Sequence, residues 1–576
     1  MKAALSKARY QDVGDVKSTG ATYTPKNLAD FVADQIVNVA DLDDAVDIPL
    51  RILDPAIGDG ELIVSLLERL REFRSRPIVI TAFDTDVRAL EYAKTRIKTC
   101  RPDVTLDFRR TSFLDYVLGH LNDRPSLFGG AEEPRFDLIV ANPPYVRTQV
   151  IGAAETQRLG RVFGLAGRVD LYQAFLIGMT QALALGGAAG VIVSNRFMTT
   201  TGAAALRCAL RTKWALHHVW DLGDTKLFDA AVLPAVLLAR GLAVGQPPEV
   251  AFSSIYETRD AVTAHADSPL AALTGAGIIG LPDGRAFQVQ HGTLTSQGDL
   301  EETWRIATDH VDGWLATVAA HTWRTFGELG KIRVGVKTCA DKVFIRQGWD
   351  ALPEDERPEL LRRLTTHHVA SRFKANRGGK WRHILYPHEV CGGGRKPVDL
   401  ELYPKSRAYL EGHRATLEGR TYVIDGGRRW YELWVPQDPA SWSRPKLVFR
   451  DISERPTFWV DLDGTVVNGD CYWLVAERQA DDHLLWLAAA VANSTFAEAF
   501  YDHRFNNKLY GGRRRFITQY VEKFPLPDPS TELGIEIAAL AKAIFDAADE
   551  RDVSRDEQAL DRLVWTAFGL SKEGRG

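Results

Sequence analysis

The 576-residue sequence is poor in cysteine, and no two cysteines stand at the short spacing of a metal-binding pair. The five are Cys100, Cys208, Cys339, Cys391 and Cys471. Such scattered thiols argue against a disulfide framework or a structural zinc site, and no metal is expected; they fit a reducing cytoplasm.

Long apolar runs are also missing. The stretch from Ala231 to Ala239 is far short of the roughly 20 residues of a membrane helix, and no apolar segment follows the N-terminal lysines. Neither a membrane span nor a secretory signal is expected.

The chain has no overall excess of positive charge. It holds 71 Lys and Arg against 75 Asp and Glu, a formal net charge of -4, so composition alone does not indicate a partner that carries phosphates. The distribution is uneven, because residues 371–450 hold 16 Lys or Arg against 8 Asp or Glu. A chain of this length predicts two or three domains. We place their boundaries at 1–245, 246–325 and 326–576, the middle segment being a Pro-, Gly- and Ser-rich connector.

Short β-branched runs alternate with helical patterns through the first half, which is typical of a mostly parallel α/β sheet. Helices are predicted between most strands, for example over Glu61–Phe73 and Val87–Thr99. The last two strands are separated only by Gly223–Ala231, too short for a crossover helix, so they should pair antiparallel. The expected sheet has seven strands: Arg51–Asp54, Val79–Phe83, Val104–Arg109, Phe136–Ala141, Gly190–Ser194, Ala215–Leu222 and Val232–Arg240.

The first strand leads into the loop Asp54-Pro-Ala-Ile-Gly-Asp-Gly60. Gly58 and Gly60 allow a sharp turn and a close approach to a ligand. The next strand ends at Asp84, about 25 residues on, where a carboxylate can bind ribose hydroxyls. The dinucleotide fingerprint G-x-G-x-x-G is absent, and the carboxylates of Asp54 and Asp59 would repel a pyrophosphate. They suit a ligand with a sulfonium and an ammonium better, although an ordinary tight turn remains an alternative.

The fourth strand ends in Asn142-Pro-Pro-Tyr145. The prolines stiffen the backbone and remove two N–H donors, which leaves local carbonyls free to accept hydrogen bonds. The amide oxygen of Asn142 and the carbonyl of Pro143 can grip both hydrogens of an amino group, while Tyr145 offers a stacking face. Such a corner would place a nitrogen in line with a methyl–sulfur bond and needs no ionised base. The alternative is a rigid turn without chemistry.

These motifs together resemble the gamma-class, Taq-type N6-adenine DNA methyltransferases. The resemblance rests on Thr22-Tyr-Thr-Pro25, the Asp54–Gly60 loop, Asp84, Asn142–Tyr145 and Leu227-Phe228-Asp-Ala-Ala-Val-Leu-Pro-Ala-Val. It implies a Rossmann-like methyltransferase domain over 1–245, S-adenosylmethionine as cofactor, and a C-terminal α+β target-recognition domain over 326–576. The substrate it implies is an adenine flipped out of double-stranded DNA, because a base inside the duplex cannot reach the methyl donor.

The same resemblance assigns roles to single residues. Thr22 and Tyr23 would contact the methionine part of the cofactor. Asp54 would lie near its amino group, Ala56 and Gly58 along the loop, and Asp84 at the ribose. Phe113 would stack on its adenine ring. Asn142, Pro143 and Tyr145 would hold the target base, with Phe228 on its other face. Ser112 stands where the family commonly has an acidic residue, so that contact falls to Asp115 or to a backbone group.

Basic and aromatic residues are interleaved in the second half, a pattern that suits contacts with phosphates and bases. This part resembles, more loosely, the target-recognition domain of the same family. A solvated surface with core tryptophans is the alternative for any one residue. The candidates for DNA contact are Lys337, Arg372, Lys374, Arg382, Arg428, Arg429, Lys508, Arg513, Arg514 and Arg515.

Five other functions can be compared with this one. N4-cytosine methylation is chemically close, but its motif more often begins with Ser or Thr. Enzymes that methylate RNA bases or protein glutamine usually lack the long C-terminal extension and the Thr22–Pro25 segment. C5-cytosine chemistry is excluded because no cysteine follows a proline. A nuclease fusion is not expected with about 20 residues before Thr22, and a silent DNA-binding defence subunit stays open. Expected partners are DNA and a cognate restriction endonuclease or defence protein.

Overall fold

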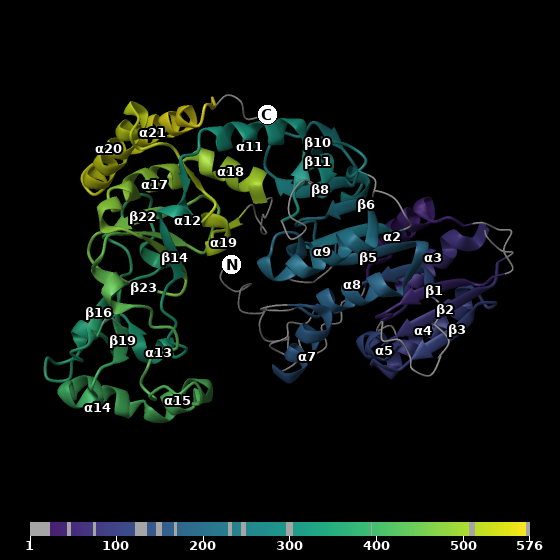
Figure 1. Cartoon of the computed structure of the whole chain (residues 1–576), viewed down its shortest axis with the longest axis horizontal. Helices are drawn as coiled ribbons and strands as arrows, with labels where there is room; N and C mark the ends of the chain where they lie inside the picture. Colours follow the sequence, from purple (N-terminus) through teal and green to yellow (C-terminus); the bar gives the residue numbers. More distant parts are fainter. Residues whose placement is uncertain are drawn as a thin grey trace. The chain divides into compact units, whose positions relative to one another are not determined.

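The computed structural model describes residues 24–42, 48–72, 76–120, 135–145, 153–165, 170–227, 233–242, 249–294, 303–392, 394–505 and 513–571. The chain divides into two compact units, and the boundary falls between Thr308 and Asp309 (Figure 1). Within the described ranges, no helix combines the length and apolar character that crossing a bilayer requires.

A large mixed sheet forms the centre of the first unit, in the strand order β3-β2-β1-β4-β5-β7-β6-β8-β11-β10-β9, with β12 paired to β11. The seven predicted strands are present as β1 (Leu50–Asp54), β2 (Ile78–Phe83), β3 (Thr105–Arg109), β4 (Phe136–Ala141), β5 (Leu183–Ser194), β6 (Trp214–Asp221) and β7 (Pro234–Gly241). The pairs among β1 to β5 are parallel, whereas β7 runs antiparallel to both β5 and β6. The predicted fold class and the antiparallel hairpin are confirmed.

Helices cover both faces of this sheet. They are α2 (Lys26–Val39), α3 (Glu61–Arg69), α4 (Val87–Cys100), α5 (Phe113–His120), α7 (Ala153–Phe163), α8 (Leu171–Ala182), α9 (Ala204–Lys213) and α10 (Pro269–Ala272). Leu138 and Val140 of β4 join one apolar cluster with α2, α3 and α4, while Ile139 and Ala141 join another with α5, α8 and α9. This alternation is the two-residue period of a strand that is buried on both faces.

Close packing of α2 on β5 depends on Gly190. A Cβ atom at this position would lie 2.6 Å from Cδ1 of Ile36 and 2.8 Å from Cγ1 of Val32. No side chain fits there, so the helix that begins just after Thr24 is held directly against the sheet. The N-terminal segment is thereby brought to the middle of the sheet.

The prediction of a connector over 246–325 is wrong. Five further strands, β8 (Ala251–Thr258), β9 (Ala264–His265), β10 (Gly277–Gly280), β11 (Ala286–Leu294) and β12 (Ile306–Ala307), extend the same sheet beyond the seven expected. β8 pairs parallel with β6 and antiparallel with β11. The segment looked irregular because its strands carry many polar residues, such as Ser253, Ser254, Gln288 and Gln290.

The second unit contains two four-stranded sheets, β14-β24-β20-β22 and β15-β17-β16-β23, and three two-stranded ribbons. Its strands are β13 (Arg324–Thr325), β14 (Gly330–Val334), β15 (Ile345–Arg346), β16 (Leu361–Thr365), β17 (Arg382–Leu385), β18 (His388–Cys391), β19 (Gly394–Pro397), β20 (Lys446–Arg450), β21 (Ile452–Ser453), β22 (Phe458–Asp461), β23 (Val466–Val467), β24 (Cys471–Ala476), β25 (Arg514–Arg515) and β26 (Pro525–Leu526). This mixture of sheets and helices confirms the α+β prediction.

Some helices of the second unit pack against the first of these sheets, where α17 contacts β20 and β22, and others join the apolar core that contains the second sheet. They are α11 (Asp309–Ala320), α12 (Phe326–Leu329), α13 (Asp341–Phe344), α14 (Pro404–Gly412), α15 (Arg414–Glu418), α16 (Thr421–Asp425), α17 (Leu484–Asn493), α18 (Thr495–Phe505), α19 (Thr518–Val521), α20 (Glu532–Ala547) and α21 (Ser554–Ala567). Trp314 of α11 is buried in this core, so the end of the predicted connector belongs to the second unit.

Candidate active site

The carboxyl ends of β1, β2 and β4 lie at one edge of the first sheet, because these strands are parallel. The chain leaves β1 to form β2 on one side, and β4 lies on the other side of β1. Such a point, where the strand order reverses, is where open α/β sheets bind their ligands. Asp54, Asp84 and Asn142 follow or end these three strands, so the topology brings the predicted residues together.

Two hydrogen bonds fix the side chain of Asn142. Its Nδ2 donates to Oγ1 of Thr24 at 3.0 Å, and its Oδ1 accepts the hydroxyl of Tyr145 at 2.9 Å. Thr24 is buried and lies two residues before α2. Sequence reasoning missed Thr24, although it stands inside the quoted Thr22–Pro25 segment.

An amide oxygen carries two lone pairs and can accept two donors, and the hydroxyl of Tyr145 is one donor to the carboxamide oxygen of Asn142. Pro143 is buried and Tyr145 half-buried at the end of the same tetrapeptide. Burial, and then the neighbouring Tyr172, raise the pKa of Tyr145 well above its usual range, so its hydroxyl stays a donor at neutral pH. The ring centroids of Tyr145 and Tyr172 are 6.3 Å apart. The corner therefore presents one fixed acceptor beside an aromatic ring.

The buried carboxylate of Asp54 is only half satisfied. Its Oδ1 accepts the amide N–H of Ala56 at 3.0 Å, whereas Oδ2 is buried and has no hydrogen-bond partner in the described part of the chain. Burial raises the pKa of Asp54 to about 8, and the nearby carboxylates of Asp84 and Asp59 add to the rise. A buried acid with a vacant oxygen is suited to a ligand that brings a positive charge.

The loop after β1 is held in shape by Asp84. Its Oδ2 accepts the amide N–H of Gly58 at 3.0 Å, and its Oδ1 accepts that of Asp86 at 2.8 Å. Gly58 and Gly60 have φ of 52° and 80°, the left-handed region that favours glycine. A Cβ on Gly60 would also lie 3.0 Å from that of Ala93 in α4. Asp84 is partly exposed, and its carboxylate has further lone pairs for hydroxyl donors.

These features fit the amino acid and ribose parts of S-adenosylmethionine. The vacant oxygen of Asp54 matches an ammonium group, and the partly exposed carboxylate of Asp84 matches a diol. The glycine loop between them has no side chain at the two positions where the backbone turns. The fit is one of donor and acceptor chemistry.

The residues after β3 are organised as a helix start. Ser112 Oγ accepts the amide N–H of Leu114 at 3.2 Å, and its carbonyl accepts that of Asp115 at 3.1 Å. Phe113 is fully buried, with ring centroids 5.5 Å from Phe83 and 5.8 Å from Phe175. Phe113 thus packs within the core, and its stacking on a cofactor ring stays a prediction.

Asp115, the other candidate for contact with the cofactor's adenine, is exposed and forms an ion pair with Arg158 at 2.8 Å. Thr22, Tyr23 and Phe228 lie outside the described residues, and their predicted roles stay predictions.

A buried polar network stands at the ends of β5, β6 and β8. Asp221 is fully buried and accepts from Tyr256 Oη at 2.6 Å, Asn195 Nδ2 at 3.0 Å and the amide N–H of Gly223 at 3.2 Å. Burial raises its pKa to about 6, although these three bonds oppose the rise. The amide N–H of Leu222 donates to the carbonyl of Pro234. The network therefore holds the chain just after β6, where Leu222 is also tied to the first residue of β7.

Sequence reasoning missed this network for two different reasons. Asn195 and Asp221 stand at strand ends, a signal that was available. Tyr256 was hidden in the supposed connector, so no pattern linked it to Asp221.

The candidates for DNA contact in the second unit fall into two groups. Lys337, Arg429 and Arg513 are exposed, and Arg382 is partly so. Arg429 is also held by the hydroxyl of Tyr431 at 2.7 Å. Lys508 lies outside the described residues. The exposed side chains have their charges available at the surface, and their contact with DNA stays a prediction.

The other candidates are held by partners within the unit. The bonded partner is Glu557 for Arg372, Asp549 for Lys374, the carbonyl of Leu433 for Arg428, Asp502 for Arg514 and Asp451 for Arg515. Arg514 uses two donors on Asp502, at 2.8 and 2.7 Å, and a third on the carbonyl of Glu454. The predicted row of three arginines is therefore divided, with Arg513 at the surface and Arg514 tied into the fold.

Comparison with known proteins gives matches in both units. The Eco57I restriction-modification methylase family matches residues 80–228, and the TaqI-like C-terminal specificity domain family matches residues 404–526. The Type II methyltransferase M.BanIII of Aneurinibacillus aneurinilyticus is 37% identical over 580 residues, which cover 96% of this chain and 98% of that protein. The chain belongs to the Type II methyltransferase family. The first match contains Asp84 and Asn142–Tyr145 of this methyltransferase, and the second confirms the predicted Taq-type recognition domain.

More distant proteins resemble this methyltransferase along most of its length. The Type II methyltransferase M.PaeR7I of Pseudomonas aeruginosa is 26% identical, with 98% of this chain and 94% of that protein covered. The Type IIL restriction-modification enzyme MmeI, solved in complex with DNA, has a TM-score of 0.56 at 12% identity. The match covers 99% of this chain and 75% of the MmeI chain. The ATP-dependent Type ISP restriction-modification enzyme LlaBIII, bound to DNA, has a TM-score of 0.52 at 10% identity. The match covers 92% of this chain and 39% of the LlaBIII chain. These two structures share the fold of the methyltransferase.

Proposed function

We propose that this Type II methyltransferase transfers the methyl group of S-adenosylmethionine to N6 of an adenine in a specific double-stranded DNA sequence. The observation that carries the proposal is the fixed carboxamide of Asn142, tied to Thr24 and Tyr145 at the same sheet edge as the half-satisfied Asp54. A rigid acceptor for an amine and a buried acid with a vacant oxygen for a cationic ligand are the two features that amino-group methylation needs.

The chain's own residues act mainly by positioning. When bound, S-adenosylmethionine supplies an electrophilic methyl carbon on a sulfonium. Oδ1 of Asn142 accepts one N–H of the target amine, and the carbonyl of Pro143 accepts the other. Both bonds strengthen as the nitrogen gains positive charge, which lowers the barrier. Tyr145 keeps the carboxamide oriented from its other lone pair. The excess proton leaves to water after the N–C bond has formed, so no side chain needs to be an ionised base.

Aromatic rings at the corner hold the base outside the duplex. Extruding a base costs a few kcal/mol, and stacking on an aromatic ring returns about 1–3 kcal/mol. Tyr145 supplies one such face, and Phe228 is proposed for the other. The second unit reads the DNA sequence through its exposed basic residues. A restriction endonuclease of the same sequence specificity, or another defence protein, is the proposed partner in the cytoplasm.

The decisive experiment is nucleoside mass spectrometry on DNA from cells that express the chain or its Asn142→Ala variant. We expect N6-methyladenine with the wild type, and at least a hundredfold less with the variant, as for loss of a preorganised transition-state hydrogen bond. Cofactor binding by the variant, measured calorimetrically, should be nearly unchanged. N4-methylcytosine in place of N6-methyladenine would overturn the choice of base. Absence of any methylated base with the wild type would favour a silent DNA-binding subunit.

A further inference from the structure

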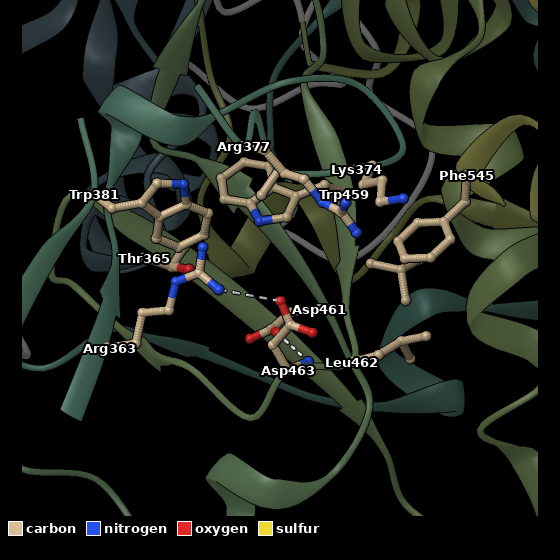
Figure 2. A pocket seen from close by; sticks show the side chains of 12 residues that line it. Arg363, Thr365, Lys374, Arg377, Trp381, Trp459, Asp461, Leu462, Asp463 and Phe545 are labelled. Carbon is tan, nitrogen blue, oxygen red and sulfur yellow. Dashed lines mark hydrogen bonds and ion pairs between the residues drawn. The ribbon is translucent and has the colours of Figure 1, made fainter. Parts of the chain in front are cut away.

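A cavity of about 580 Å³ lies in the second unit, within the size range of small-molecule sites. Its lining comes from the ends of β16 and β22, the loop after Lys374 and the side chain of Phe545 (Figure 2). The residues that shape it most are Arg363, Thr365, Arg377, Trp381, Trp459 and Phe545. The methyl-transfer chemistry proposed above uses none of them.

The floor of the cavity contains a chain of hydrogen bonds with a fixed direction. Lys446 Nζ lies 2.9 Å from Oδ2 of the buried Asp461, and Thr465 donates its hydroxyl to the same oxygen at 2.6 Å. Thr465 has thereby used its only proton. The 2.7 Å contact between Thr365 and Thr465 must then have Thr365 as donor. Thr365 consequently turns acceptor lone pairs, and no proton, toward the cavity it lines.

A hydrogen-bond donor on the same cavity is unused. Trp459 is fully buried, and its indole Nε1 has no hydrogen-bond partner among the described residues. Figure 2 shows this nitrogen turned toward the side of the cavity where Thr365 and Arg363 lie. An unpaired buried N–H costs free energy, which a ligand acceptor would recover. The interior thus offers one donor and one acceptor.

Aromatic walls and cations surround this pair. The guanidinium of Arg363 stacks 3.7 Å above the ring of Trp381, and Lys374 Nζ lies 4.8 Å from the ring of Phe545. Lys374 and Arg377 share Asp549, at 2.7 and 3.0 Å, and Arg363 is 3.5 Å from Asp463. The three cations Lys374, Arg377 and Arg363 outnumber the carboxylates of Asp549 and Asp463 by one. These side chains therefore give the opening of the cavity one net positive charge. Arg377 is 73% exposed, so its charge can reach a ligand at the rim.

We propose that this cavity binds a nucleotide. The base would lie among the aromatic rings of Trp381, Trp459 and Phe545, accepting from Trp459 and donating to Thr365. Every DNA base carries a donor beside an acceptor on its pairing edge, so the pair does not select one base. The phosphate would contact Arg363 and Arg377, whose guanidinium groups suit phosphate oxygens. The nucleotide comes either from solution as a monophosphate or from a base extruded from bound DNA.

Calorimetric titration of the full chain tests the proposal with two probes, a mixture of the four deoxynucleoside monophosphates and a short single-stranded oligonucleotide. Trp459→Phe keeps an aromatic ring but removes the indole N–H together with the five-membered ring, and Thr365→Val removes the acceptor. Each should raise the Kd about tenfold, which is the size of one lost hydrogen bond. Trp381→Ala should raise it further. Trp430→Ala is the matched control, because Trp430 stacks with Arg414 at 5.1 Å outside the cavity and should leave the Kd unchanged.

The two probes separate the sources. If the monophosphates bind, and the variants raise their Kd as expected above, the site is assigned to free nucleotides. Binding of only the oligonucleotide, in the same order, assigns it to DNA. Equal Kd values for the wild type, Trp381→Ala and Trp459→Phe with both probes would overturn the proposal. Trp381 is partly exposed, so its variant remains informative if Thr365→Val unfolds, which thermal denaturation would reveal.

Discussion

The hydroxyl of Tyr145 and the carboxamide oxygen of Asn142 are hydrogen-bonded at 2.9 Å. The tyrosine therefore has two separable parts, a ring for stacking and a hydroxyl that orients the amide. Substitutions that remove one part or both should have different effects.

Tyr145→Phe keeps the ring and loses the bond to Asn142, so we expect about a tenfold fall in kcat, the size of one hydrogen bond, with a nearly unchanged KM for DNA. Tyr145→Ala also loses stacking and should raise that KM. Its penalty should shrink when the target base is mispaired, because flipping is then easier. Steady-state kinetics on matched and mismatched duplexes measure both effects. An equal penalty on both duplexes would contradict a role in base flipping.

The pKa of Asp54 makes cofactor binding depend on pH. An ammonium group binds the ionised carboxylate, which in the free protein forms only as the pH approaches about 8. The Kd for S-adenosylmethionine should therefore rise as the pH falls below 8. Asp54→Asn should bind weakly and lose this pH dependence. Calorimetry between about pH 6 and pH 9 tests both statements, and a wild-type Kd that is flat over this range would contradict the proposed contact.

Ionisation of Asp54 should favour cofactor binding but should lower the stability of the fold. The folded chain holds the proton of Asp54 up to pH about 8, whereas the ordinary value is 3.8. Between these values the folded state binds more protons, so this group destabilises the fold progressively as the pH rises. Asp54→Asn should raise the Tm, and the gain should be larger at about pH 9 than at about pH 5. A gain that is independent of pH would show that ionisation is not its cause.

Tyr256 should stabilise the fold more at high pH than at low pH. Its hydroxyl is the nearest donor to Asp221, whose pKa lies at about 6. Tyr256→Phe should lower the free energy of unfolding by about 1–3 kcal/mol at pH 8, where the carboxylate is ionised, and by less at pH 5. Tyr92→Phe on the exposed face of α4 is the control, since that ring is 59% exposed. Urea unfolding at both pH values measures the difference.

Adjacent arginines should give contrasting phenotypes. Arg513 is exposed, and Arg513→Ala should reduce the slope of log K for DNA binding against log salt by about 1, as for one lost phosphate contact. Arg514 is 11% exposed and bidentate to Asp502, so Arg514→Ala should instead lower stability by about 3 kcal/mol. Filter binding at several salt concentrations and thermal unfolding separate the two. A salt slope that is unaltered in Arg513→Ala would place the DNA elsewhere.

The seven central strands could be predicted because parallel strands buried on both faces appear as continuous apolar runs. The meeting of Asp54, Asp84 and Asn142 followed from the same pattern, since parallel strands end at one edge. The contact of Thr24 with Asn142 could not be predicted, because it spans 118 residues and depends on how α2 packs against Gly190.

Charged residues were harder to interpret for a related reason. A run of arginines shows how much positive charge is present but not which acid lies opposite. Arg514 is neutralised by Asp502, and Arg515 by Asp451, which directly precedes β21, the strand that pairs with β25. The strand β8 escaped detection because the adjacent polar residues Ser253 and Ser254 interrupt its apolar run, although both are buried. The strand β11 escaped because polar residues alternate with Phe287 and Val289, as in a strand that is buried on one face only.

The added strand β8 places a limit on how the chain can be divided. Tyr256 reaches Asp221 from this strand, and β8 also covers the edge of β6 with backbone pairing. A fragment that ends at residue 245 would expose the edge of β6. It would also leave the buried carboxyl of Asp221 without its hydrogen bond from Tyr256. The smallest soluble catalytic piece should therefore extend to Thr308, nearly seventy residues past the last strand expected from the sequence.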